Sequence, residues 1–374
     1  KFLTSSTSEG AGLIKEKIFE TIVAKETDKS AAILSKVMAK ADDATVASVI
    51  NNITEKNANE DSKLSLKVMA DFSEKNPEKL EILTQSNQEQ IQKLTVSAVE
   101  EAKSSQEDAD LIAQVVAGAS DELVNRVVEE VSKTSTDEKQ TLSAKVLKAI
   151  VDSDSGKIDI INDDIKDTMI EQTIVSAQNQ QEGTGVQQDQ DMTSIISDII
   201  VNTNTETGSK IIEEVNNSTT ETNLSLKVIS GISEKDTGKL DVLSENNKEQ
   251  IEQLTETAVQ NAENTAEDSQ LIANVVAVVN DDLVNKVVEE VNKTAEENEK
   301  QTLSAKVLKA IVDTEPDKIE IINDENKETL IVNTVDAAKN QKEGTAAEDA
   351  TDYSNIVAEV IVKTESDTAA KVLE

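Results

Sequence analysis

Residues Gln140–Asp152 read QTLSAKVLKAIVD, and residues Gln301–Asp313 repeat the same letters. The match extends around this core, because residues 63–134 and 223–294 are identical at 39 of 72 positions without a gap. A fixed long period is typical of arrays in which each structural unit packs on its neighbours. The sequence therefore predicts a tandem-repeat protein with a repeat of about 160 residues.

Each long repeat divides into two related halves of about 80 residues. Leu64–Met69 (LSLKVM) lines up with Leu142–Leu147 (LSAKVL). Each half also carries a lysine followed by an apolar residue: Lys79-Leu80, Lys157-Ile158, Lys239-Leu240 and Lys318-Ile319. The two prolines of the chain, Pro77 and Pro316, each stand two residues before such a lysine. These signals predict repeat units of two alternating types, each holding about five helices.

The signals divide the chain into five segments. They are the tail of a preceding unit plus one inserted helix (1–63), a first-type unit (64–141), a second-type unit (142–223), a first-type unit (224–302) and a truncated second-type unit (303–374). The inserted helix is inferred because residues 18–37 resemble 196–215, with extra residues near 38–55. Since the pattern also breaks off within a unit, we interpret the chain as a window of a longer, bacterial-type repeat protein.

The spacing of apolar residues predicts helices. In Asp121–Val131 (DELVNRVVEEV), leucine and valine recur on one helical face, and the copy at 281–291 keeps this stripe. Ser120 precedes the stripe as a capping residue, and Pro77 follows Asn76 as a proline does in a first helical turn. Helix starts are also expected where serine or threonine precedes glutamate by three positions, at Ser135, Ser218 and Thr294.

Stacking of such helices predicts an all-α fold: an elongated helical-repeat solenoid or rod of right- or left-handed twist. The apolar spacing Leu283-Val284-x-x-Val287-Val288-x-x-Val291 resembles helical solenoids in general. It is similar to the superhelical domains of the bacterial flagellar rotor switch protein and of the magnesium transporter cytoplasmic domain. This resemblance implies a superhelical stack and transfers no functional residue.

The amino-acid composition disfavours two classes of binding partner, nucleic acids and membranes. The net charge is −37 and Arg126 is the only arginine, which disfavours nucleic acid and anionic membrane surfaces. No apolar run is long enough for a transmembrane helix, so we expect no membrane insertion. Salt or divalent cations would screen the acidic chain, which weakly favours an extracellular or cell-surface setting.

The residue types argue against catalysis. The chain contains neither histidine nor cysteine, so the commonest general base and the strongest nucleophile are missing. The sharpest metal candidates are Asp152, Asp154 and Asp159, whose spacing resembles a calcium loop. Gly156 stands one position early and Asp163 replaces the final glutamate, so a capped turn is the favoured interpretation, with weak Ca²⁺ binding as the alternative. Asp189 and Asp191 form a second, weaker cluster.

Two hypotheses of function remain. The first is a non-enzymatic structural protein, part of a long rod, fibre, filament or surface assembly. Its partner would be itself, by head-to-tail stacking or as neighbouring repeats of one longer chain. The second is a solenoid scaffold or cell-surface adhesin that binds an unidentified protein or glycan through its exposed face. Anchors at binding surfaces are often aromatic residues or arginines, and this chain has one tyrosine and one arginine. The structural hypothesis is therefore preferred.

Overall fold

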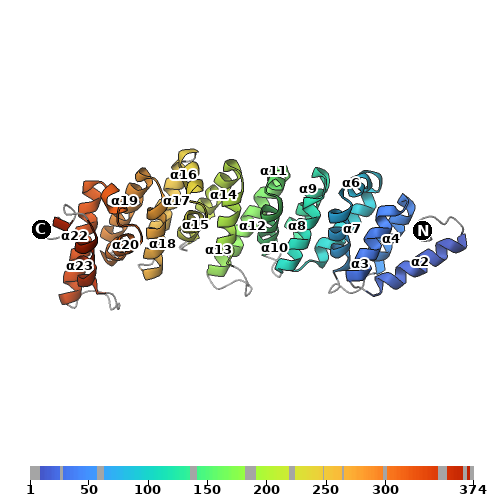
Figure 1. The fold of residues 1–374 in the computed structure, drawn as a ribbon, viewed down its shortest axis with the longest axis horizontal. Helices are drawn as coiled ribbons and strands as arrows, with labels where there is room; N and C mark the ends of the chain where they lie inside the picture. The colour runs from blue at the N-terminus through green and yellow to red at the C-terminus, as the bar shows by residue number, and fades with distance from the viewer. Residues whose placement is uncertain are drawn as a thin grey trace. The chain divides into compact units, whose positions relative to one another are not determined.

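The computed structural model describes residues 9–25, 28–56, 63–134, 141–181, 191–218, 224–246, 248–262, 265–297, 301–343, 352–364 and 369–370. Within these ranges every regular element is an α-helix, which confirms the predicted all-α repeat fold. The chain forms two compact bodies. Their helices are labelled in chain order in Figure 1. We call Lys1–Ser176 the N-terminal body and Ala177–Glu374 the C-terminal body. The division falls inside one helix and does not coincide with a predicted unit boundary.

The helices of the N-terminal body follow one another closely. In order they are α2 (Glu9–Val23), α3 (Asp28–Lys40), α4 (Asp43–Lys56), α5 (Leu64–Lys75), α6 (Pro77–Ser86), α7 (Gln88–Glu101), α8 (Gln106–Ala117), α9 (Asp121–Thr134), α10 (Leu142–Asp154), α11 (Gly156–Ile160) and α12 (Asp163–Gln181), in which the division falls.

The C-terminal body repeats this order. Its helices are α13 (Met192–Asn202), α14 (Thr205–Ser218), α15 (Leu224–Lys235), α16 (Thr237–Asn246), α17 (Lys248–Gln260), α18 (Ala266–Val278), α19 (Asp281–Glu297), α20 (Gln301–Thr314), α21 (Lys318–Ile321), α22 (Asp324–Glu343) and α23 (Tyr353–Lys363).

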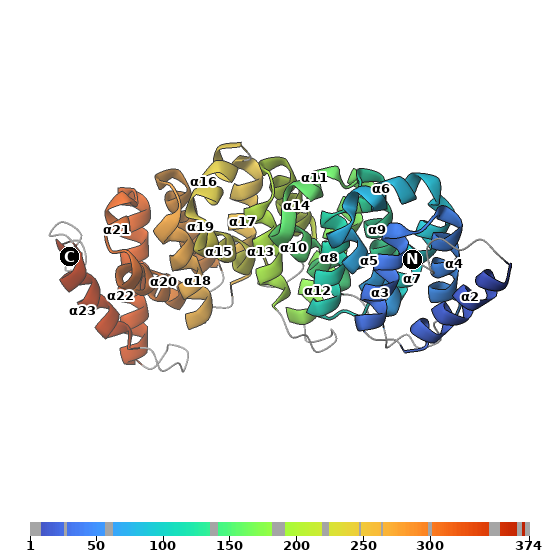
Figure 2. The ribbon, with the colours of Figure 1, turned by 45° about the vertical axis from the view of Figure 1, so that its right-hand side comes forward.

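Two layers of helices build each body. In the N-terminal body α3, α5, α8 and α10 contact one another in succession and form the first layer, while α4, α7 and α9 form the second. In the C-terminal body the first layer is α13, α15, α18, α20 and α23, and the second is α14, α17, α19 and α22. The short helices α6, α16 and α21 each link a first-layer helix to the next second-layer helix, and α11 links α10 to α12 (Figure 2).

This arrangement shows a further period. The three predicted units that begin at Leu64, Leu142 and Leu224 each contain two helical hairpins, of which the first includes a short linking helix and the second does not. Within each body, contacts run from one hairpin to the next, as expected of stacked repeats. The two hairpins of a unit share too little sequence for this shorter period to be recognised.

The predicted unit starts fall at or near helix starts. Leu64, Leu142 and Leu224 are the first residues of α5, α10 and α15, whereas Leu303 is the third residue of α20. A helix, α4, does occupy the region of the expected insertion. However, α3 packs on α5 and α4 on α7 just as α13 packs on α15 and α14 on α17. These contacts favour an alignment in which α3 and α4 are an ordinary hairpin.

Some of the helix ends lie where the capping residues of the sequence predict them. Pro77 begins α6, and the Asn280 side chain accepts a hydrogen bond from the amide of Leu283 at 3.0 Å, capping α19. The expected start at Thr294 is wrong, because α19 runs through it to Glu297. Thr294 is buried, so its side chain packs inside the second layer. Ser218 ends α14, and Ser135 lies outside the described residues.

Aliphatic side chains form the core of both bodies. The predicted stripe of α9 is buried in full: Leu123, Val124, Val127, Val128 and Val131. Helix α10 is buried on almost every side, since it lies between α8 and the second layer. Even Lys145 is only 2 % exposed, and its Nζ donates to the carbonyl of Ser104 at 2.6 Å. The repeated QTLSAKVLKAIVD segment is therefore a core helix.

Candidate functional site

The predicted metal candidates serve local contacts. Asp152 pairs with Lys148 on the same helix, with 2.7 Å between Oδ2 and Nζ. Asp154 accepts a hydrogen bond from the amide of Gly156 at 3.2 Å, and Asp159 lies on α11. Asp191 caps α13 through the amide of Thr193, while Asp189 lies outside the described residues. Within the described ranges, no three acidic side chains are grouped so as to hold a metal ion. Weak calcium binding stays a prediction.

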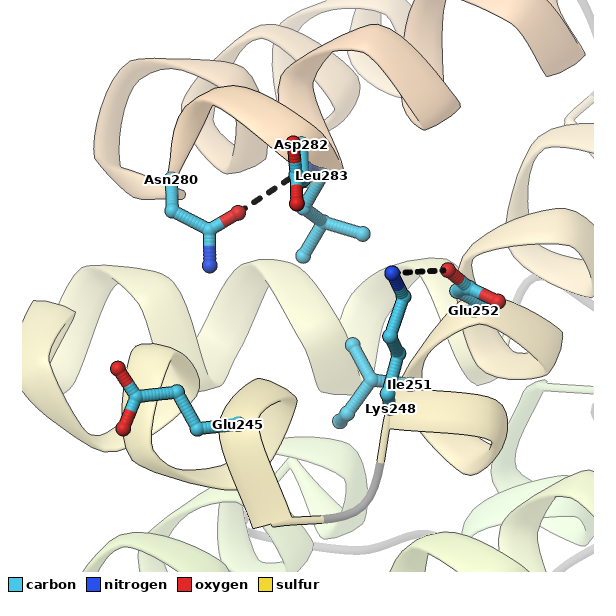
Figure 3. A pocket seen from close by; sticks show the side chains of 7 residues that line it. All are labelled: Glu245, Lys248, Ile251, Glu252, Asn280, Asp282 and Leu283. Carbon is cyan, nitrogen blue, oxygen red and sulfur yellow. Dashed lines mark hydrogen bonds and ion pairs between the residues drawn. The ribbon is translucent and has the colours of Figure 1, made fainter.

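The C-terminal body contains a small hollow of about 190 Å³ beside the start of α19 (Figure 3). Glu245 stands on one side, and the ion pair between Lys248 and Glu252, 3.7 Å long, stands on the other. Asn280 and Asp282 close the hollow from α19. The one lysine of this lining is already paired, so the hollow offers mainly carboxylate and amide oxygens.

A hollow at the matching place in the N-terminal body has a different lining. Gln85, Ser120 and Glu122 line it at the positions that correspond to Glu245, Asn280 and Asp282. The residue type differs at each of the three positions. A reaction site duplicated in both repeats would need the same functional groups at the same places. The variation argues for solvated surface between helix ends.

Three of the four recurring lysines, Lys157, Lys239 and Lys318, make the same kind of contact. Lys157 of α11 donates from Nζ to the carbonyl of Ala119 at 3.0 Å, and Lys318 of α21 donates to Val279 at 2.8 Å. Lys239 of α16 donates likewise to Thr203. Each acceptor lies at the end of a first-layer helix of the preceding hairpin, where carbonyls have no partner within the helix. Partial burial lowers the pKa of Lys239.

Asparagines of the second layer join successive hairpins in a similar way. Asn125 of α9 donates to the carbonyl of Ile160 at 3.0 Å and accepts from the amide of Asn162 at 2.6 Å. Asn285 makes the corresponding contacts with Ile321 at 3.3 Å and Asn323 at 2.7 Å. One asparagine side chain thus provides hydrogen-bond partners for a backbone carbonyl at the end of a short helix and for a backbone amide at the start of the next helix. Neither the partner nor the contact is evident from the sequence.

A buried polar cluster holds the start of α5. Glu101, 6 % exposed, accepts hydrogen bonds from the amides of Ser65 at 2.8 Å and Leu66 at 3.3 Å. Asp108, fully buried, accepts from Lys63 at 2.5 Å and from the amide of Lys103 at 2.9 Å. Lys63 has a left-handed backbone with φ of 51°, which is uncommon outside glycine. The repeat carries Asn261 and Asn223 in place of Glu101 and Lys63, so the cluster does not recur as a unit.

Comparison with known proteins gives no family. No family model matches the chain, and no curated protein matches it. Among solved structures, the chain is similar to an engineered protein with 15 % identity and a TM-score of 0.32, covering 95 % of this chain and 98 % of that one. It is also similar to a circular tandem-repeat protein with 15 % identity and a TM-score of 0.28, covering 98 % and 81 %. Scores this low carry no argument about function.

Among the described helices, none combines the length and the apolar character that a bilayer crossing needs.

Proposed function

We propose that the chain is a non-enzymatic structural repeat protein whose work is to extend a stack of helical hairpins. The observation that carries this proposal is the repeated lysine contact. If the recurring residues formed the active site of an enzyme, their side chains would converge on one pocket. Here Lys157, Lys239 and Lys318 instead each tie a short linking helix to the preceding hairpin.

The stacking surfaces support this function physically. A hairpin with one apolar side must bury it on a neighbour, and the lysine and asparagine contacts fix how the neighbours meet. The same contacts would join neighbouring repeats of a longer chain. An apolar hairpin face of one molecule meeting the opposite face of another would give head-to-tail assembly, which is a heterologous contact that forms filaments.

Electron microscopy tests the proposal directly. The purified chain is imaged in negative stain at about 50 mM and about 500 mM NaCl, because screening shortens the reach of the negative charges. Each condition is repeated with millimolar CaCl₂, and light scattering gives the mass in solution. Filaments or end-to-end particles are expected at high salt or with calcium. Single particles of monomer mass in every condition would contradict self-assembly.

A further inference from the structure

The first layer of the N-terminal body carries an open groove between α8 and α10. The groove has a volume of about 830 Å³, and its accessible lining is mostly apolar. Leu111, Ala113, Ala117 and Ala149 lie along it. Ala117 is exposed and Leu111 is half-buried, so apolar surface faces solvent here. Small alanine side chains also allow another backbone to approach closely.

Carboxylates border the apolar floor of the groove, which Leu111, Ala113, Ala117 and Ala149 form. Glu107 and Asp110 stand on α8 and Asp152 on α10, while no lysine or arginine lines the groove. A second groove over α3 and α5 adjoins the first through Glu107, Leu111 and Gln114. It adds the carboxylates of Asp28, Asp71 and Glu74, of which Asp28 pairs with Lys67 and Asp71 pairs with Lys75. An occupant of this surface must therefore bring apolar groups for the floor and positive charge for the rim.

The corresponding surface of the C-terminal body carries a neutral hydrogen bond between side chains of α18 and α20. Gln270 and Thr314 stand where Asp110 and Ser153 stand in the N-terminal body, and their side chains meet at 3.2 Å across α18 and α20. Gly231 replaces Asp71, which removes another carboxylate. Carboxylates at positions 110 and 71 thus belong to the N-terminal copy of this surface, and the C-terminal copy provides a matched control within the same chain.

We propose that the groove between α8 and α10 binds a basic amphipathic helix of a partner protein. An apolar stripe at positions i, i+4 and i+7 of that helix would rest on Leu111 and the alanines. Lysines or arginines beside the stripe would reach Glu107 and Asp110, whereas Asp152 is already paired with Lys148 at 2.7 Å. Helix α8 has 12 residues and is about 18 Å long at 1.5 Å per residue, which matches about three turns of a docked helix. The proposal goes beyond the stacking function and does not depend on it.

Binding of a defined probe tests the proposal. The probe is a fluorescent 14-residue peptide of leucine and lysine with leucines on one helical face, and its control is a scrambled peptide of the same composition. Titration into the full chain is followed by fluorescence anisotropy at about 50 mM and about 500 mM NaCl. The amphipathic peptide should bind about 10-fold more tightly than the scrambled one, because only it can cover the apolar floor. Equal affinities would overturn the proposal, since any basic peptide is attracted by the net charge of −37.

Matched variants locate the binding. Ala117→Tyr fills the groove at an exposed position and should weaken the amphipathic peptide about 10-fold, whereas Ala277→Tyr, at the corresponding position of α18, should leave its affinity unchanged. Glu107→Gln should weaken binding about 3-fold at low salt, with Glu267→Gln as its control. Far-UV circular dichroism verifies folding of each variant. Equal effects of the two tyrosine variants would place binding elsewhere and overturn the proposal. Assembly is read separately by microscopy, so failure here leaves the stacking function untouched.

Discussion

The Nζ atom of Lys318 lies 2.8 Å from the carbonyl oxygen of Val279, 39 residues earlier in the chain. Val279 caps the end of α18, and Lys318 begins α21 in the next hairpin. A positive charge at a helix C-terminus is favourable because the last carbonyls lack partners. The contact therefore couples a helix end to its neighbour and explains why lysine recurs at this position.

Replacement of this lysine should destabilise the stack. Lys318→Met keeps most of the apolar stem and removes the charged donor, so the free energy of unfolding should fall by about 1–2 kcal/mol. Lys157→Met should act similarly in the N-terminal body, because its contact with Ala119 is equivalent. Urea unfolding, monitored by circular dichroism, should show a midpoint at a lower urea concentration for each variant.

A surface lysine provides the control for these variants. The Lys339 side chain is 66 % exposed and pairs only locally with Asp336. Lys339→Met should lower the free energy of unfolding by less than about 0.5 kcal/mol. Equal shifts for Lys339→Met and Lys318→Met would show that general charge, and not the contact with Val279, determines stability.

Asn285 should contribute through two separable hydrogen bonds. It donates to the carbonyl of Ile321 and accepts from the amide of Asn323. Asn285→Ala removes both and should cost about 1–2 kcal/mol, whereas Asn285→Asp keeps the acceptor and should cost less. Hydrogen exchange at the Asn323 amide distinguishes the two: protection should be lost in the alanine variant and retained in the aspartate variant. Loss of protection in both would contradict this assignment.

Periodic features of the fold were predictable from the sequence, and contacts between hairpins were not. The stripe Leu123, Val124, Val127, Val128 and Val131 predicts α9 because helical spacing is a local property. The lysine signal was recognised, but its acceptors lie 36 to 39 residues away and are backbone atoms, which no side-chain pattern marks. The groove between α8 and α10 likewise arises only when two helices meet. The helix start predicted at Thr294 was wrong because a capping pattern inside a long helix has the same sequence as one at a helix start.

Ion pairs between α20 and α23 should make the C-terminal hairpin sensitive to acid. Hydrogen bonds from Lys309 and then Lys363 hold the pKa of Asp313 below its usual value of 3.8. A carboxylate with a lowered folded-state pKa stabilises the fold above the unfolded pKa, and this contribution disappears as the pH falls through the folded pKa. The contribution should thus be complete above about pH 5 and should disappear progressively as the pH falls from there through the folded pKa, which lies below 3.8.

Nuclear magnetic resonance titration of the Asp313 carboxyl tests this assignment. Lys363→Met removes the partner on α23, so the pKa of Asp313 should rise toward 3.8 and α23 should lose part of its acid sensitivity. Lys339→Met serves as the control, since its partner is Asp336 and it is expected to leave Asp313 unchanged. An unchanged pKa in Lys363→Met would show that Lys309 alone accounts for the shift.

Gly118 lies at a close approach between the end of α8 and α5. A Cβ atom at this position would meet the carbonyl oxygen of Ser73 at 2.5 Å and its carbonyl carbon at 2.9 Å. The obstacle is backbone, so the helices themselves must separate, and Gly118→Ala should cost about 1–3 kcal/mol. Gly238→Ala is the matched control, because its Cβ would come no closer than 3.5 Å to another atom. That variant should be neutral or slightly stabilising, since alanine favours helix over glycine. Urea midpoints of the two variants decide the question, and equal stabilities would refute the steric explanation.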